Sequence, residues 1–291
     1  MRVLSAIFRL AASLGLAFAA CASTDVVQRA NDLYERTDYA GSLHVLAADP
    51  APDAASFMLT GKNYFMSGDY KKAIELFEKA RIITPNSSDC ELWLGRAWGR
   101  RAETGGWMVA AAHASKARQH FERAVVLDPN NREAKNDLFS FYLDAPGFLG
   151  GGLDKAEAHA RSIATERPAE SEFELAQVAE KRKEFSTAES HLRRAIEFAP
   201  AEAGRVVDLA RFLAKRGRSK ESDTLFDRAV KMAPNQPRFL FAEASVAIEN
   251  HRDTEHAREL LQTYLRASLT PDDPPRSEAE KLLRRLGGPA Q

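Results

Sequence analysis

Prolines recur along the chain at a nearly constant interval, and this period constrains the fold more than any other feature of the sequence. Pro85, Pro129, Pro168, Pro200 and Pro234 are separated by 44, 39, 32 and 34 residues. Proline ends an α-helix because its ring removes a backbone N–H and clashes with the preceding turn. An interval of about 34 residues between such stops holds two short helices, so the sequence predicts a repeated pair of helices.

Small residues occupy fixed places within each interval. In the clearest unit, Gly61 lies in the predicted first helix, and Ala73 and Ala80 lie in the second helix ahead of Pro85. Later second helices repeat the alanines at Ala117 and Ala124, Ala156 and Ala160, Ala188 and Ala195, and Ala229. Small side chains let two helices approach closely where they cross. Since one pair of helices cannot bury its own apolar faces, neighbouring pairs are expected to stack.

This pattern resembles the tetratricopeptide repeat, a helix–turn–helix unit of about 34 residues with small residues at the crossing and proline at its end. In the unit that begins at Ala54, Phe57, Gly61 and Tyr64 stand at repeat positions 4, 8 and 11. The resemblance implies an all-α fold, an α-solenoid of about seven units that forms a right-handed superhelix. The expected units are residues 23–53, 54–87, 88–131, 132–168, 169–202, 203–236 and 237–271, followed by a C-terminal capping helix at 277–287.

The first 20 residues have the pattern of a signal peptide, which is set aside before the fold is considered. Arg2 and Arg9 precede an uncharged apolar stretch at residues 10–20, which is shorter than the roughly 20 residues of a membrane span. Residues 18–21 (Phe-Ala-Ala-Cys) resemble the lipobox of bacterial lipoproteins, although that family prefers Leu at the first position. The resemblance implies lipid attachment at Cys21, export, and a place on the periplasmic side of a membrane.

Two other fates of Cys21 stay open from the residues alone. Signal cleavage after Ala19 would leave a soluble periplasmic protein, and a disulfide could join Cys21 to Cys90. Two cysteines are too few for a disulfide-stapled scaffold or a four-cysteine zinc site.

Loss of the signal removes two of the 41 basic residues and none of the 41 acidic ones, so the net charge becomes 39 − 41 = −2. A charge this close to neutral argues against a general nucleic-acid binder.

Two intervals exceed the period, by 10 and 5 residues, and both excesses fall between the first and second helix of a unit. Residues 99–113 and 144–152 are therefore predicted as inserted loops, and equivalent turns of consecutive units should be neighbours. Each insertion combines an aromatic residue with glycines. The predicted loop site consists of Trp107, Phe148, Gly150, Gly151 and Gly152. Two interpretations stay open: the aromatic rings bind a small molecule or polysaccharide, or they fold back as a small satellite core.

In the family that this pattern resembles, the first helices line a concave groove that holds an extended peptide or a partner helix. The resemblance assigns this role to repeat positions 2, 5, 9, 12 and 13. The residues in question are Met58, Lys62, Phe65, Met66, Leu92, Arg96, Arg100, Asn136, Ser140, Phe173, Gln177, Lys181, Val207, Arg211 and Lys215. They combine adaptable apolar side chains with basic ones. The sequence thus predicts a groove for an acidic or mixed peptide, with a merely solvated basic face as the alternative.

Motifs of catalysis and of cofactor binding are absent from the sequence. Residues 150–155 (Gly-Gly-Gly-Leu-Asp-Lys) lack the Lys-Ser/Thr pair of a phosphate-binding loop and follow no predicted strand. The seven histidines are dispersed, and neither H-E-x-x-H nor G-x-S-x-G occurs. Cys90 lies between two acidic residues, which disfavour a reactive thiolate. The prediction is a non-catalytic scaffold of the bacterial cell envelope, with no metal or cofactor and with a protein as its partner.

Overall fold

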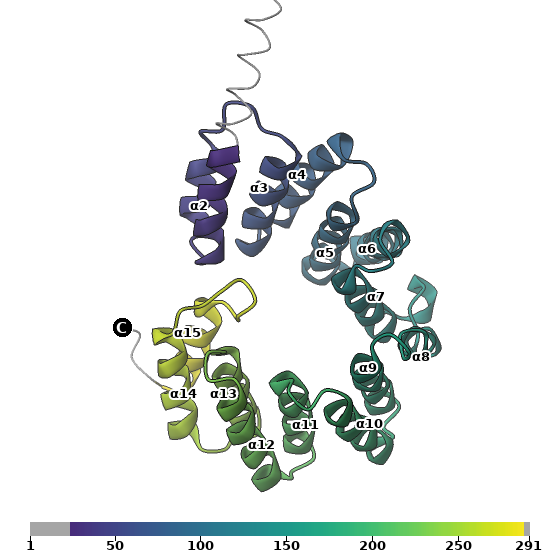
Figure 1. Cartoon of the computed structure of the whole chain (residues 1–291), viewed down its shortest axis with the longest axis vertical. Helices are drawn as coiled ribbons and strands as arrows, with labels where there is room; N and C mark the ends of the chain where they lie inside the picture. The colour runs from purple at the N-terminus through teal and green to yellow at the C-terminus, as the bar shows by residue number, and fades with distance from the viewer. Residues whose placement is uncertain (1–23, 288–291) are drawn as a thin grey trace, which may run out of the picture. The chain divides into compact units, whose positions relative to one another are not determined.

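The computed structural model describes residues 24–287, apart from the side chains of Trp107 and Met108, and divides into two compact units (Figure 1). Unit 1 comprises Met1–Gly150 and unit 2 comprises Gly151–Gln291. All regular secondary structure in the described residues is helical, which confirms the predicted all-α class and solenoid architecture. Within residues 24–287, no helix is both long enough and apolar enough to cross a membrane.

Unit 1 is a series of helices in which each packs against the next along the chain. Residues 24–35 form its first described helix. The others are α2 (Tyr39–Leu46), α3 (Ala54–Met66), α4 (Tyr70–Ile83), α5 (Ser88–Thr104), α6 (Trp107–Leu127), α7 (Arg132–Asp144) and the 3-10 turn η1 (Gly147–Leu149). Helices α3 and α4 form one antiparallel pair and α5 and α6 the next, and α4 packs on α5 between them.

Unit 2 continues the same plan. Its helices are α8 (Leu153–Ser162), α9 (Pro168–Lys181), α10 (Phe185–Phe198), α11 (Ala203–Lys215), α12 (Ser219–Met232), α13 (Arg238–Glu249), α14 (Thr254–Arg266) and α15 (Arg276–Arg285). The pairs are α9 with α10, α11 with α12, and α13 with α14. Helix α15 packs on α14, where Ala279 and Leu282 join the apolar cluster around Leu261 and Tyr264. The exact boundaries of the repeat units stay a prediction.

Polar side chains fix where the helices of unit 1 begin. Asp53 accepts a hydrogen bond from the backbone N–H of the third residue of α3, and Asp69, Ser87 and Asn131 do the same for α4, α5 and α7. Such caps satisfy backbone donors that have no partner inside the helix. Gly68, with φ of 84°, supplies the left-handed backbone conformation that turns the chain from α3 into α4.

The predicted crossing residues lie where two helices come closest. A Cβ atom placed on Gly61 of α3 would lie 2.5 Å from Cε1 of Phe77 on α4. A Cβ atom on Gly95 of α5 would likewise lie 2.6 Å from Cδ1 of Phe121 on α6. In both pairs the ring of the second helix fills the space that a side chain on the first helix would need. The spacing of each helix pair therefore depends on glycine at this position.

We expect Gly61→Ala to destabilise unit 1 by ~1–3 kcal/mol, because Phe77 is fully buried and has no room to move away from the new methyl group. Gly99→Ala is the matched control, since a Cβ there meets only the Cβ of Ala117, at 4.0 Å. The control should be neutral or stabilising by up to ~1 kcal/mol, as expected for alanine inside a helix. Urea unfolding of both variants measures the difference, and equal stabilities would contradict the crossing argument.

The first insertion is not a loop, and this prediction was wrong. Residues 99–104 extend α5 to 17 residues, and residues 107–113 extend α6 to 21 residues. Only Gly105 and Gly106 lie outside the two helices. The inserted sequence is rich in alanine, arginine and other helix-favouring residues, so its intrinsic propensity continues both helices until the two glycines interrupt them. The ten extra residues therefore produce a longer helical hairpin.

The second insertion is a loop, as predicted. Helix α7 ends at Asp144, and Ala145 adopts an extended conformation ahead of Pro146, as expected of a residue that precedes proline. The turn η1 follows, and Gly150 and Gly152 then adopt φ angles of 90° and 126°. These are angles that residues with a side chain rarely adopt, so the backbone conformation at both positions favours glycine.

Candidate functional site

A cleft of about 780 Å³ lies in unit 1 between α5, α6, α7 and the loop that follows α7. Its lining is mainly apolar. The rings are Phe65, Trp93, Phe121, Phe141 and Phe148, and the alanines are Ala102, Ala110, Ala111, Ala114, Ala117 and Ala145. Five charged residues, Arg96, Arg100, Glu103, Asp137 and Asp144, complete most of the remaining surface. A cavity of this size and character is typical of ligand-binding sites.

Both insertions contribute to this cleft. The lengthened α6 presents Ala110, Ala114 and Ala117, which lie on one face of the helix at intervals of four and three residues. The loop after α7 contributes Phe148 and its neighbours from the other side. The two insertions therefore lie next to each other, as the stacking of equivalent turns predicted.

Phe148 is exposed at the mouth of the cleft. Its side chain is 83% exposed, so the ring does not fold back into a satellite core. The side chain of Trp107, the other aromatic residue of the predicted loop site, lies outside the described residues. Gly150, Gly151 and Gly152 do not line the cleft, and Gly150 instead packs closely against the side chain of Arg118. Of the predicted loop site, Phe148 is thus the residue that the structure places in the cleft.

Four residues of the predicted groove also line the cleft: Phe65, Arg96, Arg100 and Ser140. The predicted groove and the predicted loop site, which the sequence suggested as separate binding surfaces, therefore meet at one place. The ring centroids of Phe65 and Trp93 lie 5.3 Å apart in an edge-to-face arrangement. This contact joins the part of the lining from α3 to the part from α5.

The charges of the cleft are paired within the chain. Nε of Arg96 on α5 lies 2.6 Å from Oδ2 of Asp137 on α7, and Nη2 of Arg96 lies 2.9 Å from Oε2 of Glu133. Burial raises the pKa of Asp137 above its ordinary value, although the guanidinium of Arg96 acts in the opposite direction. Arg100 pairs with Glu103 and donates a hydrogen bond to the hydroxyl of Tyr70. These pairs do not favour a purely acidic ligand.

Comparison with known proteins agrees with the helix pairs and with the crossing residues. Models of the tetratricopeptide repeat match residues 54–87 and 207–274. These two segments are similar to the tetratricopeptide repeat and together cover about a third of the chain. Repeats of this kind generally mediate protein–protein interactions. One residue of the first segment, Phe65, lines the cleft.

Solved structures of tetratricopeptide proteins share the fold. A tetratricopeptide repeat protein from Parabacteroides merdae is 13% identical with a TM-score of 0.57, over 92% of this chain and 99% of that chain. A thermophilic tetratricopeptide protein from Thermus thermophilus is 18% identical with a TM-score of 0.53, over 66% of this chain and 99% of that chain. No curated protein matches the sequence. At these identities the likeness shows the fold alone.

Two predicted groove residues do not face a groove. Leu92 is 1% exposed and Val207 is 4% exposed, and each belongs to an apolar cluster between helices. Neither can contact a partner, because neighbouring helices cover the face of the repeat on which they lie. The expectation that repeat position 5 of these two units lines a groove was therefore wrong.

The other predicted groove residues lie outside the cleft. Met58, Lys62, Met66 and Asn136 are half-buried in unit 1, and Lys62 lies with Nζ 5.0 Å from the centroid of the Trp93 ring. In unit 2, Phe173 and Gln177 are half-buried, whereas Lys181, Arg211 and Lys215 are exposed along α9 and α11. Nζ of Lys215 lies 3.6 Å from a carboxylate oxygen of Glu180.

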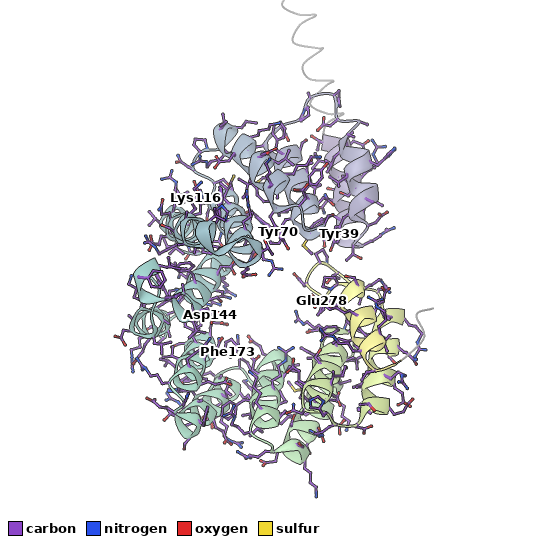
Figure 2. The ribbon with its side chains drawn as sticks, turned by 180° about the vertical axis from the view of Figure 1, so that it is seen from behind. Tyr39, Tyr70, Lys116, Asp144, Phe173 and Glu278 are labelled. Atoms are coloured by element: carbon purple, nitrogen blue, oxygen red, sulfur yellow. The ribbon has the colours of Figure 1, made fainter. Side chains whose placement is uncertain are left out.

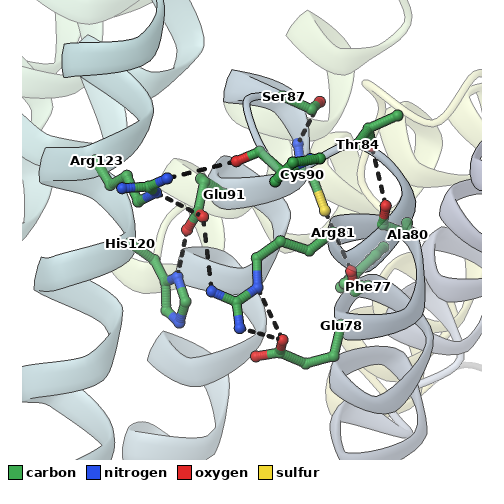
Figure 3. A network of polar contacts seen from close by, with 11 residues as sticks. Phe77, Glu78, Ala80, Arg81, Thr84, Ser87, Cys90, Glu91, His120 and Arg123 are labelled. Atoms are coloured by element: carbon green, nitrogen blue, oxygen red, sulfur yellow. Dashed lines mark hydrogen bonds and ion pairs between the residues drawn. The ribbon is translucent and has the colours of Figure 1, made fainter.

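A buried carboxylate connects the α5–α6 hairpin to α4 (Figure 3). Glu91 of α5 is 1% exposed and contacts His120 Nδ1 at 2.6 Å, Arg123 Nε at 3.0 Å and Arg81 Nη1 at 3.9 Å. Burial by itself raises the pKa of Glu91, but the hydrogen bond with His120 and the surrounding positive charges lower it overall. Glu91 therefore stays ionised and connects α4, α5 and α6 at a place away from the cleft.

The described residues contain no reactive thiol and no group that could hold a metal ion. Cys90 is a free, buried thiol whose Sγ donates a hydrogen bond to the carbonyl oxygen of Phe77 (Figure 3). Burial raises the pKa of this thiol to about 12. A disulfide between Cys90 and Cys21 would need a sulfur atom that the surrounding helices cover. Cys21 itself lies outside the described residues.

Sequence reasoning missed part of the lining, namely Glu103, Phe141 and the alanine face of α6. The signal was present, because Ala117 and Phe121 continue backwards to Ala110 and Ala114 at helical spacing. The predicted loop at 99–113 concealed it. Asp137 and Asp144 carried no such signal, since acidic residues occur on every exposed helix face.

Asp208 of α11, between Val207 and Arg211, gives unit 2 a specific pH dependence. Burial raises the pKa of Asp208 to about 6, against the opposing charges of Arg205 and Arg211. The unfolded value is about 3.9. The folded unit therefore holds this proton more tightly than the unfolded chain does, and its stability falls as the pH rises from about 4 to about 6.

We expect Asp208→Asn, which cannot ionise, to lose this part of the pH dependence. The free energy of unfolding of the variant, relative to that of the wild type, should therefore be higher at about pH 7.5 than at about pH 5. Urea unfolding of both proteins at the two pH values measures the change. A stability difference that is the same at both pH values would contradict the role of Asp208.

Proposed function

We propose that the chain is a non-catalytic scaffold that binds a segment of a partner protein in the cleft of unit 1. The observation that carries this proposal is an apolar cleft of about 780 Å³ with an exposed Phe148 at its mouth, built onto tetratricopeptide repeats. Exposed apolar surface that is concave and edged by charges is typical of protein-binding sites.

The energetics of Phe148 support this proposal. Complete burial of a phenylalanine side chain contributes about 1.5–3 kcal/mol of favourable free energy. The ring projects from a loop between α7 and α8 and is 83% exposed, so a partner that covers it gains most of this amount. Removal of the ring should leave the fold intact, because few contacts inside the chain depend on it.

A second candidate function is the binding of a small molecule or polysaccharide, and the volume of the cleft falls in the range of about 300–1,000 Å³ that such ligands use. The lining argues for a protein over a polysaccharide. Most of its residues are apolar, and Arg96 with Asp137 and Arg100 with Glu103 already pair within the chain, whereas sugars present many hydroxyl groups. An apolar small molecule is the remaining alternative, and the experiment below distinguishes it from a protein partner.

Ala111 and Ala112 provide a matched test of the cleft. Both are exposed alanines at consecutive positions of α6, but only Ala111 lines the cleft. We expect Ala111→Arg to reduce recovery of the crosslinked partner by about tenfold or more, because the long charged side chain would occupy the cleft and place a charge against its mainly apolar lining. Ala112→Arg should bind as the wild type does, and both variants should unfold at the same temperature.

Affinity capture from crosslinked native membranes, quantified for the wild type and both variants, checks this expectation. Equal recovery with Ala111→Arg and Ala112→Arg would contradict binding in the cleft. Native mass spectrometry of the purified wild type separates the alternative, since a bound small molecule that Ala111→Arg lacks would favour that function instead.

For the place of action, we propose the periplasmic side of a bacterial membrane, with a lipid attached at Cys21. Support comes from the positively charged and apolar signal pattern and from the Phe-Ala-Ala-Cys motif at residues 18–21. Cys21→Ala should move the protein from the membrane fraction to the soluble periplasmic fraction. Cys90→Ala is the control that keeps the lipid. Unchanged membrane association of Cys21→Ala in cell fractionation would rule out the lipid anchor.

A further inference from the structure

We propose that one edge of unit 2 binds the surface of an anionic lipid bilayer. This edge is formed by two turns, one between α9 and α10 and one between α11 and α12, together with the residues next to them. The proposal concerns unit 2 alone, so it requires neither the cleft of unit 1 nor a lipid at Cys21. The exposed basic residues of the two turns, which we call the basic edge, are Lys181, Lys183, Lys215, Arg216 and Lys220.

Side-chain contacts hold the two turns side by side. The guanidinium carbon of Arg216, in the second turn, lies 4.0 Å from the centroid of the Phe185 ring, at the start of α10. Nη1 of Arg218 lies 2.5 Å from Oε2 of Glu189, which also belongs to α10. The basic residues of both turns therefore lie on one continuous surface.

The structure divides the basic residues of these turns into two groups. Arg182 and Arg218 are half-buried, and each pairs with two carboxylates. The residues of the basic edge are exposed instead, and Lys183, Arg216 and Lys220 form no ion pair with the residues that the structure describes. The carboxylates of the first group are Asp154 and Glu157 for Arg182, and Glu189 and Glu221 for Arg218.

Exposed carboxylates in the same segments, residues 180–185 and 215–221, do not neutralise the basic edge. Glu184 and Glu221 are exposed, and Glu221 already pairs with Arg218. Glu180 is half-buried, and its Oε1 lies 3.6 Å from Nζ of Lys215. Among the exposed residues of these segments, five basic ones stand against two acidic ones, a local charge of 5 − 2 = +3. The chain without its signal has a net charge of −2, so this positive charge is a local feature.

The interior of the α9–α11 contact treats a basic residue differently. Arg205 of α11 lies with its guanidinium carbon 4.5 Å from the centroid of the Phe173 ring of α9, which Figure 2 labels. Arg205 also pairs with Glu170 and Asp208. Between the helices the chain thus supplies the partners of a positive charge, whereas at the turns the positive charges face the solvent.

Charge complementarity identifies the partner as an anionic surface. Lysine and arginine residues close to a bilayer with anionic lipids each add favourable free energy, and a cluster of four to eight is typical of lipid-binding proteins. Phe185, which is 36% exposed, adds an apolar ring of the kind that enters the boundary between head groups and acyl chains. The basic edge combines helix ends and turns of two helix pairs, so it suits an extended surface better than a single bound peptide.

Sedimentation with lipid vesicles tests the proposal. The protein is the chain without residues 1–20 and with Cys21→Ala, because a lipid at Cys21 would attach it to any vesicle. We expect binding to vesicles with about 30% phosphatidylglycerol at about 0.1 M salt, and no binding to vesicles of phosphatidylcholine alone. About 0.5 M salt should release the protein, because it screens charges at a surface.

Two substitutions reduce the charge of the basic edge and keep the fold. Lys183 has a φ of 65°, and Gly68 and Gly217 adopt the same left-handed conformation in equivalent turns, so Lys183→Gly suits the backbone. Lys220 is the second residue of α12, where an acidic side chain is favourable, so Lys220→Glu suits the helix. Binding to the anionic vesicles should weaken about fivefold for Lys183→Gly and about 20-fold for Lys220→Glu.

Lys71→Glu is the matched control in unit 1. Lys71 is the exposed second residue of α4, as Lys220 is of α12, but the turn before it, residues 67–69, contains no basic residue. This variant should bind the anionic vesicles as strongly as the unchanged chain does. All three variants should unfold at the temperature of the unchanged chain or above it.

Each of the other outcomes would overturn the proposal. Equal binding to both kinds of vesicle would show that charge is not what binds, and equal effects of Lys220→Glu and Lys71→Glu would exclude the basic edge. Release by inorganic phosphate, but not by chloride of the same ionic strength, would assign the edge to a free anion. Binding to polyglutamate in place of vesicles, lost in Lys220→Glu, would assign it to an acidic protein. Partner capture with Ala111→Arg tests the cleft separately.

Discussion

The close approach of two helices at a position without a side chain is the constraint on which the rest of this structure depends. Where Gly61 meets Phe77 and Gly95 meets Phe121, the ring of one helix occupies the space beside the backbone of the other. This contact sets the distance between the two helices of a pair. That distance determines which apolar helix faces remain for the next pair to cover. Apolar clusters then form between successive helices rather than around one centre.

Buried carboxylates restrict this stacking further. Glu91 is surrounded by His120, Arg123 and Arg81, and in unit 2 a carboxylate oxygen of Glu174 lies 3.0 Å from Nδ1 of His159. Burial of a charge is costly unless its partners are in place. Apolar faces alone would tolerate a neighbour shifted by one turn, but a shifted neighbour would leave these carboxylates unpaired. The polar contacts thus disfavour wrong registers, while the apolar contacts supply the stability.

The sequence predicted the features that depend on residues close together in the chain. It did not predict the features that depend on which distant helix packs against a residue. Prolines, capping residues and crossing glycines act within a few residues of themselves, so the helix pairs and the all-α class could be predicted. The burial of Leu92 and Val207 depends on which helix covers them, and the pairing of Arg96 with Asp137 joins residues 41 positions apart. The prediction of a loop at 99–113 assumed that inserted residues form a loop between the helices. The helix propensity of these residues instead makes them part of α5 and α6.

The lengthened hairpin explains why the two predicted binding surfaces become one. Extra turns lengthen α5 and α6, and a face of the lengthened α6 lines the cleft. On α6 this face consists mainly of alanines, which expose less apolar area than larger apolar side chains would. A leucine face at the same place would favour aggregation. Binding then gains its free energy chiefly from large side chains of the partner and from Phe148, which makes the cleft selective for ligands that bring apolar bulk.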